Sequence, residues 1–280
     1  MDVLRIAAFT DTPDGGNPAG VVLDATELSA ERMLEIAAEV GYSETAFLLP
    51  RNGGGEYDVR YFSPLAEVPF CGHATVASAV ALAERAGPGR FSFATAAGTV
   101  PVDVATDPDG RLRATLTSVA TRVVDLADAD LAELLRALAW SAGDLDPALP
   151  PRVAYAGAHH PVIAVRSRER LADLQYDMAA LTALMTARDW TTVQLVWRSP
   201  AGEFHVRNPF PVGGVYEDPA TGAAAAALGG YLRELGLVPA DATLHLSQGD
   251  DMGRPGRLTV ELRAGEPGVR VSGTAVPVQE

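Results

Sequence analysis

A strand, a loop and an apolar helix occur twice in this sequence, and that repetition constrains the fold more than any other feature. In the first copy a strand at 57–62 leads through a loop to an Ala/Val-rich helix at about 74–86. The second copy, from 204 to 236, has the same order. Both helices are apolar on most sides, which is typical of helices enclosed in a core. A single duplication predicts two similar halves rather than a solenoid.

The two copies can be aligned on their strands. Residues 57–60 match residues 204–207, so each strand ends in arginine, and the GHAT motif at 72–75 then falls beside the PATG motif at 219–222. The backbone N–H groups at a helix start need partners, and the positive end of the helix dipole favours an anion. Because small-molecule sites often lie at domain interfaces, we expect the two helix starts to face one shared cleft.

Short strands joined by Gly/Asp turns surround both helices. This pattern predicts an α+β fold rather than an alternating β-α-β chain with a parallel sheet. The chain has 280 residues, about the length at which one core gives way to two. We therefore expect an N-terminal domain at 1–117 and a C-terminal domain at 118–280, with the last strand, at 269–276, able to return to the first domain.

Composition excludes several classes of function. The net charge is −14 and every basic residue is arginine, so a Schiff-base lysine and a lysine-containing phosphate loop are impossible. The acidic balance argues against nucleic acid as a partner. No run of eighteen apolar residues occurs, so we expect no membrane partner. One cysteine excludes an internal disulfide, which fits a cytoplasmic location.

Two polar residues of the first copy are candidates for proton transfer. Glu44 precedes an apolar strand, where desolvation would raise a carboxyl pKa from about 4.3 and make a usable proton shuttle. The alternative is a solvated loop carboxylate. His73 lies at the start of the first helix, where the dipole disfavours imidazolium, so a neutral histidine is expected. The alternative is a buried histidine with a structural role.

Other residues are open to two interpretations. Asp218, in the second copy, could cap the helix or orient a substrate, and its neighbour Glu217 is expected to face solvent. Cys71 could be an acid/base thiol, because a helix N-terminus lowers a thiol pKa, or simply a small packed residue. The second copy offers Pro219 and its neighbours at that place and no second cysteine. No Cys/His/Asp spacing matches a zinc site, so we predict no metal.

Five sequence blocks, in this order, resemble the PhzF-like isomerase family of phenazine biosynthesis, which shares its fold with diaminopimelate epimerase. They are FTDTPDGGNPAGVV (9–22), SETAFL (43–48), RYFSPLAEVPFCGHAT (60–75), GGVYEDPATGAAA (213–225) and SQGDDMGRPG (247–256). The resemblance implies two pseudo-symmetric domains, each a mostly antiparallel barrel-like sheet around a central helix, with the active site between them. Members of this family are often homodimers.

The resemblance also implies roles for individual residues. In the family a glutamate moves a proton within trans-2,3-dihydro-3-hydroxyanthranilate without a cofactor, assisted by a histidine and an aspartate. These roles fall on Glu44, His73 and Asp218. Substrate binding is assigned to Asn17, Gly72, Gly222 and Ala223.

This chain departs from the family pattern at one position and from diaminopimelate epimerase at another. The family usually has a serine after DPATG, where this chain has Ala223. Diaminopimelate epimerase uses two cysteines, and only Cys71 occupies such a position here.

We therefore expect a cofactor-independent isomerase acting on a small carboxylate-bearing, unsaturated or cyclic amino or hydroxy acid. Two alternatives remain at this stage. One is a non-catalytic binding protein on the same fold, which the missing serine favours slightly. The other is a cysteine-dependent racemase or dehydratase.

Overall fold

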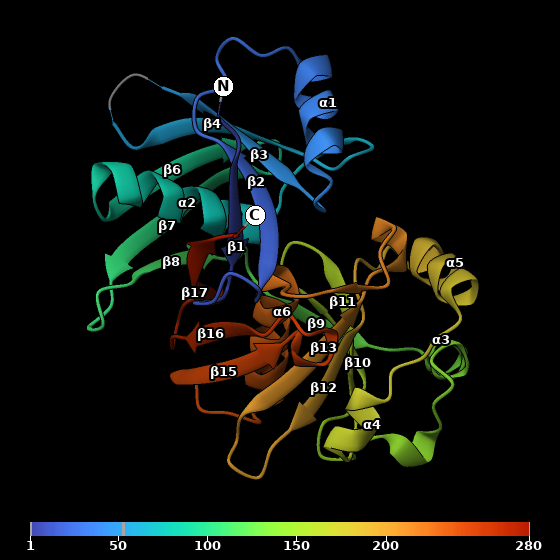
Figure 1. The fold of residues 1–280 in the computed structure, drawn as a ribbon. Coiled ribbons are helices and arrows are strands. Elements are labelled where there is room, and N and C mark those ends of the chain that lie inside the picture. Colours follow the sequence, from blue (N-terminus) through green and yellow to red (C-terminus); the bar gives the residue numbers. More distant parts are fainter. Residues whose placement is uncertain (1, 52–53, 280) are drawn as a thin grey trace. The chain divides into compact units, whose positions relative to one another are not determined.

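The structure is a computed structural model that describes residues 2–51 and 54–279. The chain divides into two compact units (Figure 1). Unit 1 comprises Met1–Thr117 and Ser272–Glu280, and unit 2 comprises Ser118–Val271. The chain therefore returns to unit 1 with its last strand.

Unit 1 is a closed barrel of eight strands around one helix. The strands neighbour one another in the order β17, β1, β2, β3, β4, β6, β7, β8 and back to β17. The β2–β3 and β4–β6 pairs are parallel. The bounds are β1 (Leu4–Ala8), β2 (Asn17–Val22), β3 (Thr45–Pro50), β4 (Glu56–Phe62), β6 (Gly89–Thr95), β7 (Gly98–Thr106), β8 (Leu112–Thr117) and β17 (Arg270–Pro277).

Helix α2 (Gly72–Ala86) is the central helix of this barrel. Every residue from 73 to 83 is buried, and the helix contacts β1, β2, β3, β7 and β8. Its small side chains let the surrounding strands approach closely. The Tyr61 hydroxyl of β4 lies 2.7 Å from Oγ1 of Thr75 and ties the sheet to the first turn of the helix. Burial raises the pKa of Tyr61, so this hydroxyl stays protonated.

Two smaller elements complete unit 1. The short strand β5 (Glu67–Val68) pairs with the end of β4. Helix α1 (Ala30–Val40) begins after Ser29, whose side chain accepts a hydrogen bond from the Arg32 N–H, as expected for an N-cap. Its apolar stripe, including Met33 and Ile36, packs with Phe47 and Phe62.

Unit 2 repeats this plan. Its strands pair in the order β9, β10, β11, β12, β13, β15, β16. The order of parallel and antiparallel pairs along these strands is the same as the order from β17 to β7 in unit 1. Helix α6 (Gly222–Glu234) contacts β9, β10, β11 and β16. The predicted α+β fold with two pseudo-symmetric halves is confirmed. The bounds are β9 (Arg122–Asp125), β10 (Arg152–Tyr155), β11 (His159–Ala164), β12 (Gln194–Arg198), β13 (Phe204–Pro209), β14 (Glu217–Asp218), β15 (Ala242–Gln248) and β16 (Gly256–Leu262).

Unit 2 also contains α3 (Asp128–Ala137), α4 (Arg168–Ala172), α5 (Met178–Arg188) and three 3₁₀ turns, η1 (Ala142–Asp144), η2 (Pro211–Gly213) and η3 (Asp250–Met252). The apolar spacing over 170–187 predicts one helix, and that prediction is wrong. Asp177 starts a new helix there, because its side chain accepts a hydrogen bond from the Ala180 N–H. The guanidinium of Arg207 donates to the Ala172 carbonyl and so satisfies the end of α4.

The strand registers correct the sequence alignment of the two halves by three residues. Both central helices begin at a glycine, four residues after the short strand that precedes them. The connection between β13 and β14, at 210–216, is three residues longer than the one between β4 and β5, at 63–66. Thus Gly72 corresponds to Gly222 and not to Pro219. By the same register His73 corresponds to Ala223, Cys71 to Thr221, and Val68 to Asp218.

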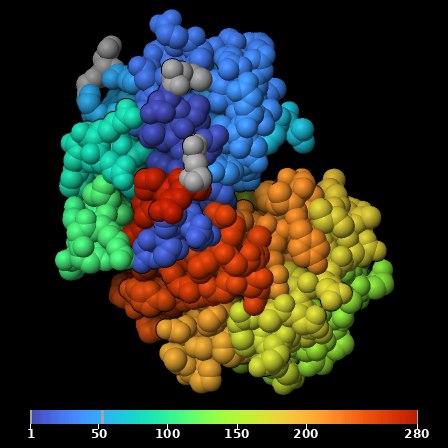
Figure 2. Space-filling view, in the orientation of Figure 1, coloured from blue at the N-terminus to red at the C-terminus, as the bar shows by residue number. Residues whose placement is uncertain are grey.

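The two ends of the chain meet in unit 1. Strand β17 pairs antiparallel with β1, and Ile6 lies opposite Pro277. In Figure 2 the red atoms of the C-terminal strand lie against the blue atoms of the N-terminal segment. Among the helices of the described chain, none has both the length and the apolar character needed to cross a membrane.

Candidate active site

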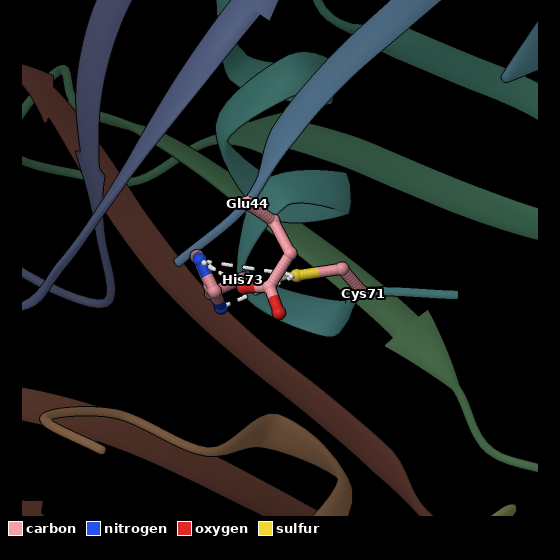
Figure 3. A group of neighbouring side chains, drawn as sticks. All are labelled: Glu44, Cys71 and His73. Atoms are coloured by element: carbon pink, nitrogen blue, oxygen red, sulfur yellow. Dashed lines mark hydrogen bonds and ion pairs between the residues drawn. The ribbon is translucent and has the colours of Figure 1, made fainter. Parts of the chain in front are cut away.

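Three side chains that sequence analysis singled out converge in unit 1 (Figure 3). The Oε2 atom of Glu44, just before β3, lies 3.5 Å from Nε2 of His73 and 3.5 Å from Sγ of Cys71. The thiol of Cys71 lies 3.3 Å from Nδ1 of His73. Cys71 and His73 are buried, whereas the Glu44 side chain keeps 15% of its surface exposed. The predicted catalytic glutamate and histidine are therefore neighbours, and the cysteine lies with them.

Asn17 fixes the orientation of His73. Its side-chain Nδ2, at the start of β2, donates to Nδ1 of His73 across 3.1 Å, and the asparagine is only 2% exposed. A neutral imidazole that accepts at Nδ1 carries its proton on Nε2. Nε2 lies 3.5 Å from Oε2 of Glu44 and 3.4 Å from Oγ of Ser43. The sequence could not reveal this contact, because 56 positions separate the two residues.

The start of α2 lies at the same place. Cys71 is the N-cap residue, but its side chain makes no capping hydrogen bond, and the first turn contains no acidic residue. The Cys71 carbonyl instead accepts from the N–H and the hydroxyl of Thr75. The N–H groups of Gly72 and its neighbours thus begin a buried helix without a side-chain cap, which is an arrangement suited to an anionic group.

In unit 2 the predicted site residues lie at the start of α6. Asp218 does not cap this helix; the N-cap residue is Thr221, whose hydroxyl donates to Oδ2 of Asp218 at 2.5 Å. Gly222 is the first residue of α6 and is buried, and Ala223 follows with part of its surface exposed. A carboxylate held by a hydroxyl in this way is oriented and remains an acceptor.

Gln248 organises the same helix start and was missed by sequence analysis. It is 1% exposed, and its amide nitrogen donates to the Asp218 carbonyl at 2.7 Å and to Oγ1 of Thr221 at 3.0 Å. Its amide oxygen accepts from the Thr221 N–H. The only available signal was its place in the SQGDD block, within the family-like pattern.

The prediction that Glu217 faces solvent is wrong. Its side chain is buried, and Oε1 and Oε2 accept from Nε and Nη2 of Arg207 at 2.9 and 2.5 Å. Burial by itself would lower the pKa of Arg207, but the hydrogen bonds and charge of Glu217 raise it above its usual value. Arg207 therefore stays charged, and its contact with Glu217 links β13 to the strand that carries Asp218.

Glu44, Cys71 and His73 are also arranged so that they could hold a metal ion. Each offers one ligand atom, and these atoms lie within 4.8 Å of one another. Sequence spacing rules did not indicate this group, because Glu44 precedes Cys71 by 27 positions and reaches it only through the fold.

Comparisons with known proteins agree with this fold. The phenazine biosynthesis-like protein family (PhzC-PhzF) matches residues 6–280. The uncharacterized isomerase YfhB of Bacillus subtilis (strain 168) is 31% identical over 98% of this chain and 96% of its own length. The trans-2,3-dihydro-3-hydroxyanthranilate isomerase of Pseudomonas chlororaphis is 32% identical over 97% of this chain and 95% of its own length.

A solved structure supports the same assignment. The phenazine biosynthesis protein of the PhzF family from Bacillus anthracis superimposes with a TM-score of 0.89 and 28% identity. The match covers 99% of this chain and 96% of that one. The chain therefore belongs to the phenazine biosynthesis-like protein family, and it is an isomerase.

Proposed function

We propose that this isomerase moves a proton by acid/base catalysis within a small carboxylate-bearing, unsaturated or cyclic amino or hydroxy acid. One observation carries the proposal. The carboxylate of Glu44 lies beside the Nε2 atom of a buried, oriented His73 at the uncapped start of a buried helix. A carboxylate so placed can accept and return a proton while its charge is stabilised.

In this mechanism Glu44 takes a proton from one carbon of the substrate. The electron pair of the broken C–H bond delocalises through the unsaturated system. The carboxylic acid then returns its proton to a second carbon, and the carboxylate is regenerated. His73, with its proton on Nε2, presents a polar N–H 3.5 Å from Oε2 of Glu44 and so stabilises that group when it is charged. No atom is gained or lost, so this step needs no oxidant, reductant or second substrate.

The start of α2 supplies binding for the substrate carboxylate in this proposal. The N–H of Gly72 and the positive end of the helix dipole stabilise an anion there by about 0.3–1 kcal/mol when exposed and up to about 2 kcal/mol when partly buried. This contact is present in substrate and transition state alike, so it mainly lowers KM. Substrates without a carboxylate should therefore bind poorly.

Residues of unit 2 complete the proposed machinery. We assign Asp218 to assisting the reaction and Gly222 and Ala223 to substrate binding. The Asp218–Thr221–Gln248 network supports this assignment because it holds one carboxylate in a fixed orientation. The expected cleft shared by the two helix starts stays a prediction. Because Ala223 lacks the hydroxyl usual in the family, we propose a substrate other than trans-2,3-dihydro-3-hydroxyanthranilate, the compound for which the P. chlororaphis relative is named.

A two-thiol racemase is disfavoured by the same comparison of halves. Thr221 stands where the counterpart of Cys71 would be, and the chain has one cysteine. A threonine hydroxyl cannot replace a thiolate as a base at neutral pH.

The decisive experiment replaces Glu44 with glutamine. We expect Glu44→Gln to lower kcat by about 10²–10⁴-fold, because the variant has the same shape but cannot accept a proton. Ligand affinity, measured by calorimetry with candidate carboxylic acids, should change little. In ²H₂O the wild type should place deuterium on one substrate carbon, and the variant should place none.

Glu39→Gln is the matched control, since Glu39 is an exposed glutamate paired with Arg32 on α1. This variant should keep wild-type turnover. Full turnover in Glu44→Gln would refute the assignment of the base.

We also propose a homodimer in the cytoplasm. The dimer follows the tendency of the resembling family, and the single, buried cysteine suits a reducing compartment. Light scattering after gel filtration tests the dimer, and a monomer mass at assay concentrations would contradict it.

A further inference from the structure

We propose that Glu44, Cys71 and His73 form a binding site for a soft divalent cation of the Zn²⁺ class, and that an ion bound there inhibits the isomerase. The ligand atoms would be Oε2 of Glu44, Sγ of Cys71 and Nε2 of His73. The ion in this proposal is a competitor of the substrate and not a resident cofactor.

The three atoms lie close enough together to share a metal ion once the Cys71 side chain turns. Their separations are 3.5 Å from Oε2 to Nε2, 3.5 Å from Oε2 to Sγ, and 3.8 Å from Sγ to Nε2. Sγ lies nearer to Nδ1, at 3.3 Å, so rotation about the Cα–Cβ bond of Cys71 has to bring it to an ion on the Nε2 lone pair. Ligands of a tetrahedral zinc ion, at about 2.0–2.3 Å from the metal, lie roughly 3.3–3.7 Å from one another. A direct N–H···O hydrogen bond is shorter, about 2.7–3.2 Å. The Glu44–His73 separation therefore suits a shared ion better than a direct bond.

The charges and chemical types also match. A carboxylate and a thiolate supply two negative charges to a divalent ion, and the imidazole binds as a neutral ligand. On binding, the Cys71 S–H bond breaks, its electron pair goes to the metal, and the proton passes to solvent. Sulfur and imidazole ligands select Zn²⁺, Cd²⁺ or Co²⁺ over Mg²⁺ and Ca²⁺. Burial of Cys71 and His73 strengthens the attraction by excluding water.

Asn17 is placed to support the bound state as well. A metal on Nε2 requires the imidazole proton to be on Nδ1, which must then donate to an acceptor. Turning the Asn17 amide over places its oxygen where Nδ2 now lies, 3.1 Å from Nδ1. A tetrahedral ion on three protein ligands keeps a fourth position, which water or an anion can occupy.

Inhibition is the functional consequence, and it rests on the proposed role of Glu44. An ion on Oε2 occupies the lone pair that would take the substrate proton. The binding of the ion itself does not depend on that role, so the two claims can be tested separately.

Binding is tested with Co²⁺ on the full chain after treatment with a chelator. A thiolate bound to Co²⁺ gives a charge-transfer absorption in the near ultraviolet, and tetrahedral Co²⁺ gives intense visible bands. Because the chain contains one cysteine, any such charge-transfer signal comes from Cys71. We expect the signal to saturate with Co²⁺ and to disappear when Zn²⁺ is added.

Variants assign the ligands. Cys71→Ser should remove the charge-transfer band, and both Cys71→Ser and Glu44→Gln should weaken Zn²⁺ binding by on the order of 10–100-fold or more, measured by competition with a chromophoric chelator. Cys71→Ala is the second variant if the serine disturbs folding, which circular dichroism reports. The matched control is His159→Ala, which removes a partly exposed histidine whose Nδ1 lies 3.5 Å from Asp189 with no thiol in that pair.

Each outcome is decisive. Absence of the charge-transfer band in the folded wild type, or Zn²⁺ affinity unchanged by Cys71→Ser, overturns the metal site. If Zn²⁺ binds to the wild type without reducing turnover, the proposed inhibition is wrong and the metal site stands. If Zn²⁺ reduces turnover and a chelator restores it, both the metal site and the inhibition are supported. Failure of the proposed function would appear in the Glu44→Gln assay and would leave the Co²⁺ spectrum of the wild type unchanged.

Discussion

The start of α2 carries Cys71 and His73, whereas the start of α6 carries Thr221 and Ala223 at the corresponding positions. Both helices begin with glycine, are largely buried and follow a two-residue strand. The fold common to both units therefore requires a small first residue in the helix, but it does not determine which side chains stand next to that residue. In the proposed mechanism proton transfer belongs to unit 1, and unit 2 contributes an oriented carboxylate.

The same comparison extends to an arginine–glutamate pair that occurs in both halves. In unit 1 Arg60 binds Glu67, which lies opposite Phe62, and in unit 2 Arg207 binds Glu217, which lies opposite Pro209. The side chains of the first pair are 34% and 40% exposed, but those of the second are only 9% and 2% exposed. The carbonyls of Leu171 and Ala172 also accept from Arg207. An equivalent pair is thus a surface contact in one half and part of the core in the other.

The largest effect we predict is on the stability of unit 2. Glu217→Ala should lower the free energy of unfolding by about 3–5 kcal/mol, because it leaves the buried Arg207 without its carboxylate. Glu67→Ala should cost about 0–1 kcal/mol, because solvent replaces an exposed partner. Urea denaturation of both variants measures the difference.

A double variant sharpens this test. Arg207→Met combined with Glu217→Leu removes both charges and should recover much of the lost stability, since the desolvation cost disappears with them. Equal losses from Glu217→Ala and Glu67→Ala would show that the difference in burial has no energetic consequence.

The two buried histidines also differ. His73 has polar side-chain partners at both ring nitrogens. His160, on β11, has Nδ1 within 2.8 Å of Oγ1 of Thr192, which donates to Oδ1 of Asn208, but within the described chain Nε2 has no hydrogen-bond partner. Desolvation lowers the pKa of His160 to about 3. The proposed catalytic histidine is therefore hydrogen-bonded on both sides, and the structural one is kept neutral by burial.

His160 predicts a pH dependence of stability. Its pKa is about 3 in the folded chain and 6.5 as the reference value, so below pH 6.5 the unfolded chain binds a proton that the folded chain does not. Stability is therefore fully present above that pH and falls below it, by up to about 1.4 kcal/mol per pH unit until the folded pKa is reached. At pH 4.5 this loss amounts to about 2–3 kcal/mol.

Thermal unfolding of His160→Gln between pH 7 and pH 4 measures this contribution, because the glutamine side chain does not bind a proton in this range. The variant should lose less stability on acidification than the wild type. His245→Gln, which changes an exposed histidine, is the control and should follow the wild type. Parallel curves for wild type and His160→Gln would contradict the prediction.

Sequence patterns predicted those parts of the fold that local chemistry determines. The apolar runs located both central helices. A capping serine at 29 and the helical spacing of Met33 and Ile36 likewise predict a helix to about residue 40, where α1 is found. The Gly, Pro and Asp residues at 10–20 predict a loop, but its last residues belong to β2, which begins at Asn17. That strand depends on pairing with β1, which is a long-range contact and not a property of the local composition.

The site was only partly predictable for the same reason. Motifs named Glu44 and His73, but the contact of Asn17 with His73 and the burial of Glu217 depend on strands that meet only in the folded chain. The three-residue error in aligning the halves arose because a longer loop, 210–216, is invisible without the register of β14. The motifs indicated which residues are candidates, and the strand register determines which of them are neighbours in the fold.

The two central helices differ in the middle as well. Counting from their first glycines, Ala79 and Val80 of α2 correspond to Gly229 and Gly230 of α6. A Cβ atom built on Gly230 would lie 2.5 Å from Cβ of Thr121, and both groups belong to unit 2. The absence of a side chain there is thus required by close packing against Thr121, whereas α2 has space for a valine.

The smallest effect we predict comes from making α6 resemble α2 at this point. Gly230→Ala should gain about 0.8–1 kcal/mol from helix propensity but lose about 1–3 kcal/mol from the forced contact, for a net loss of about 0–2 kcal/mol. Combining it with Thr121→Gly removes the side chain it would meet, but it also removes the hydroxyl that accepts from Arg233, so the double variant should lose less than the sum of the two single losses. Ala79→Gly in α2 should cost about 0.5–1 kcal/mol from propensity and about 0.8 kcal/mol more from the loss of a buried methyl group. A stabilised Gly230→Ala variant in urea denaturation would show that the β9 segment moves aside without cost, and that the glycine is not required by packing.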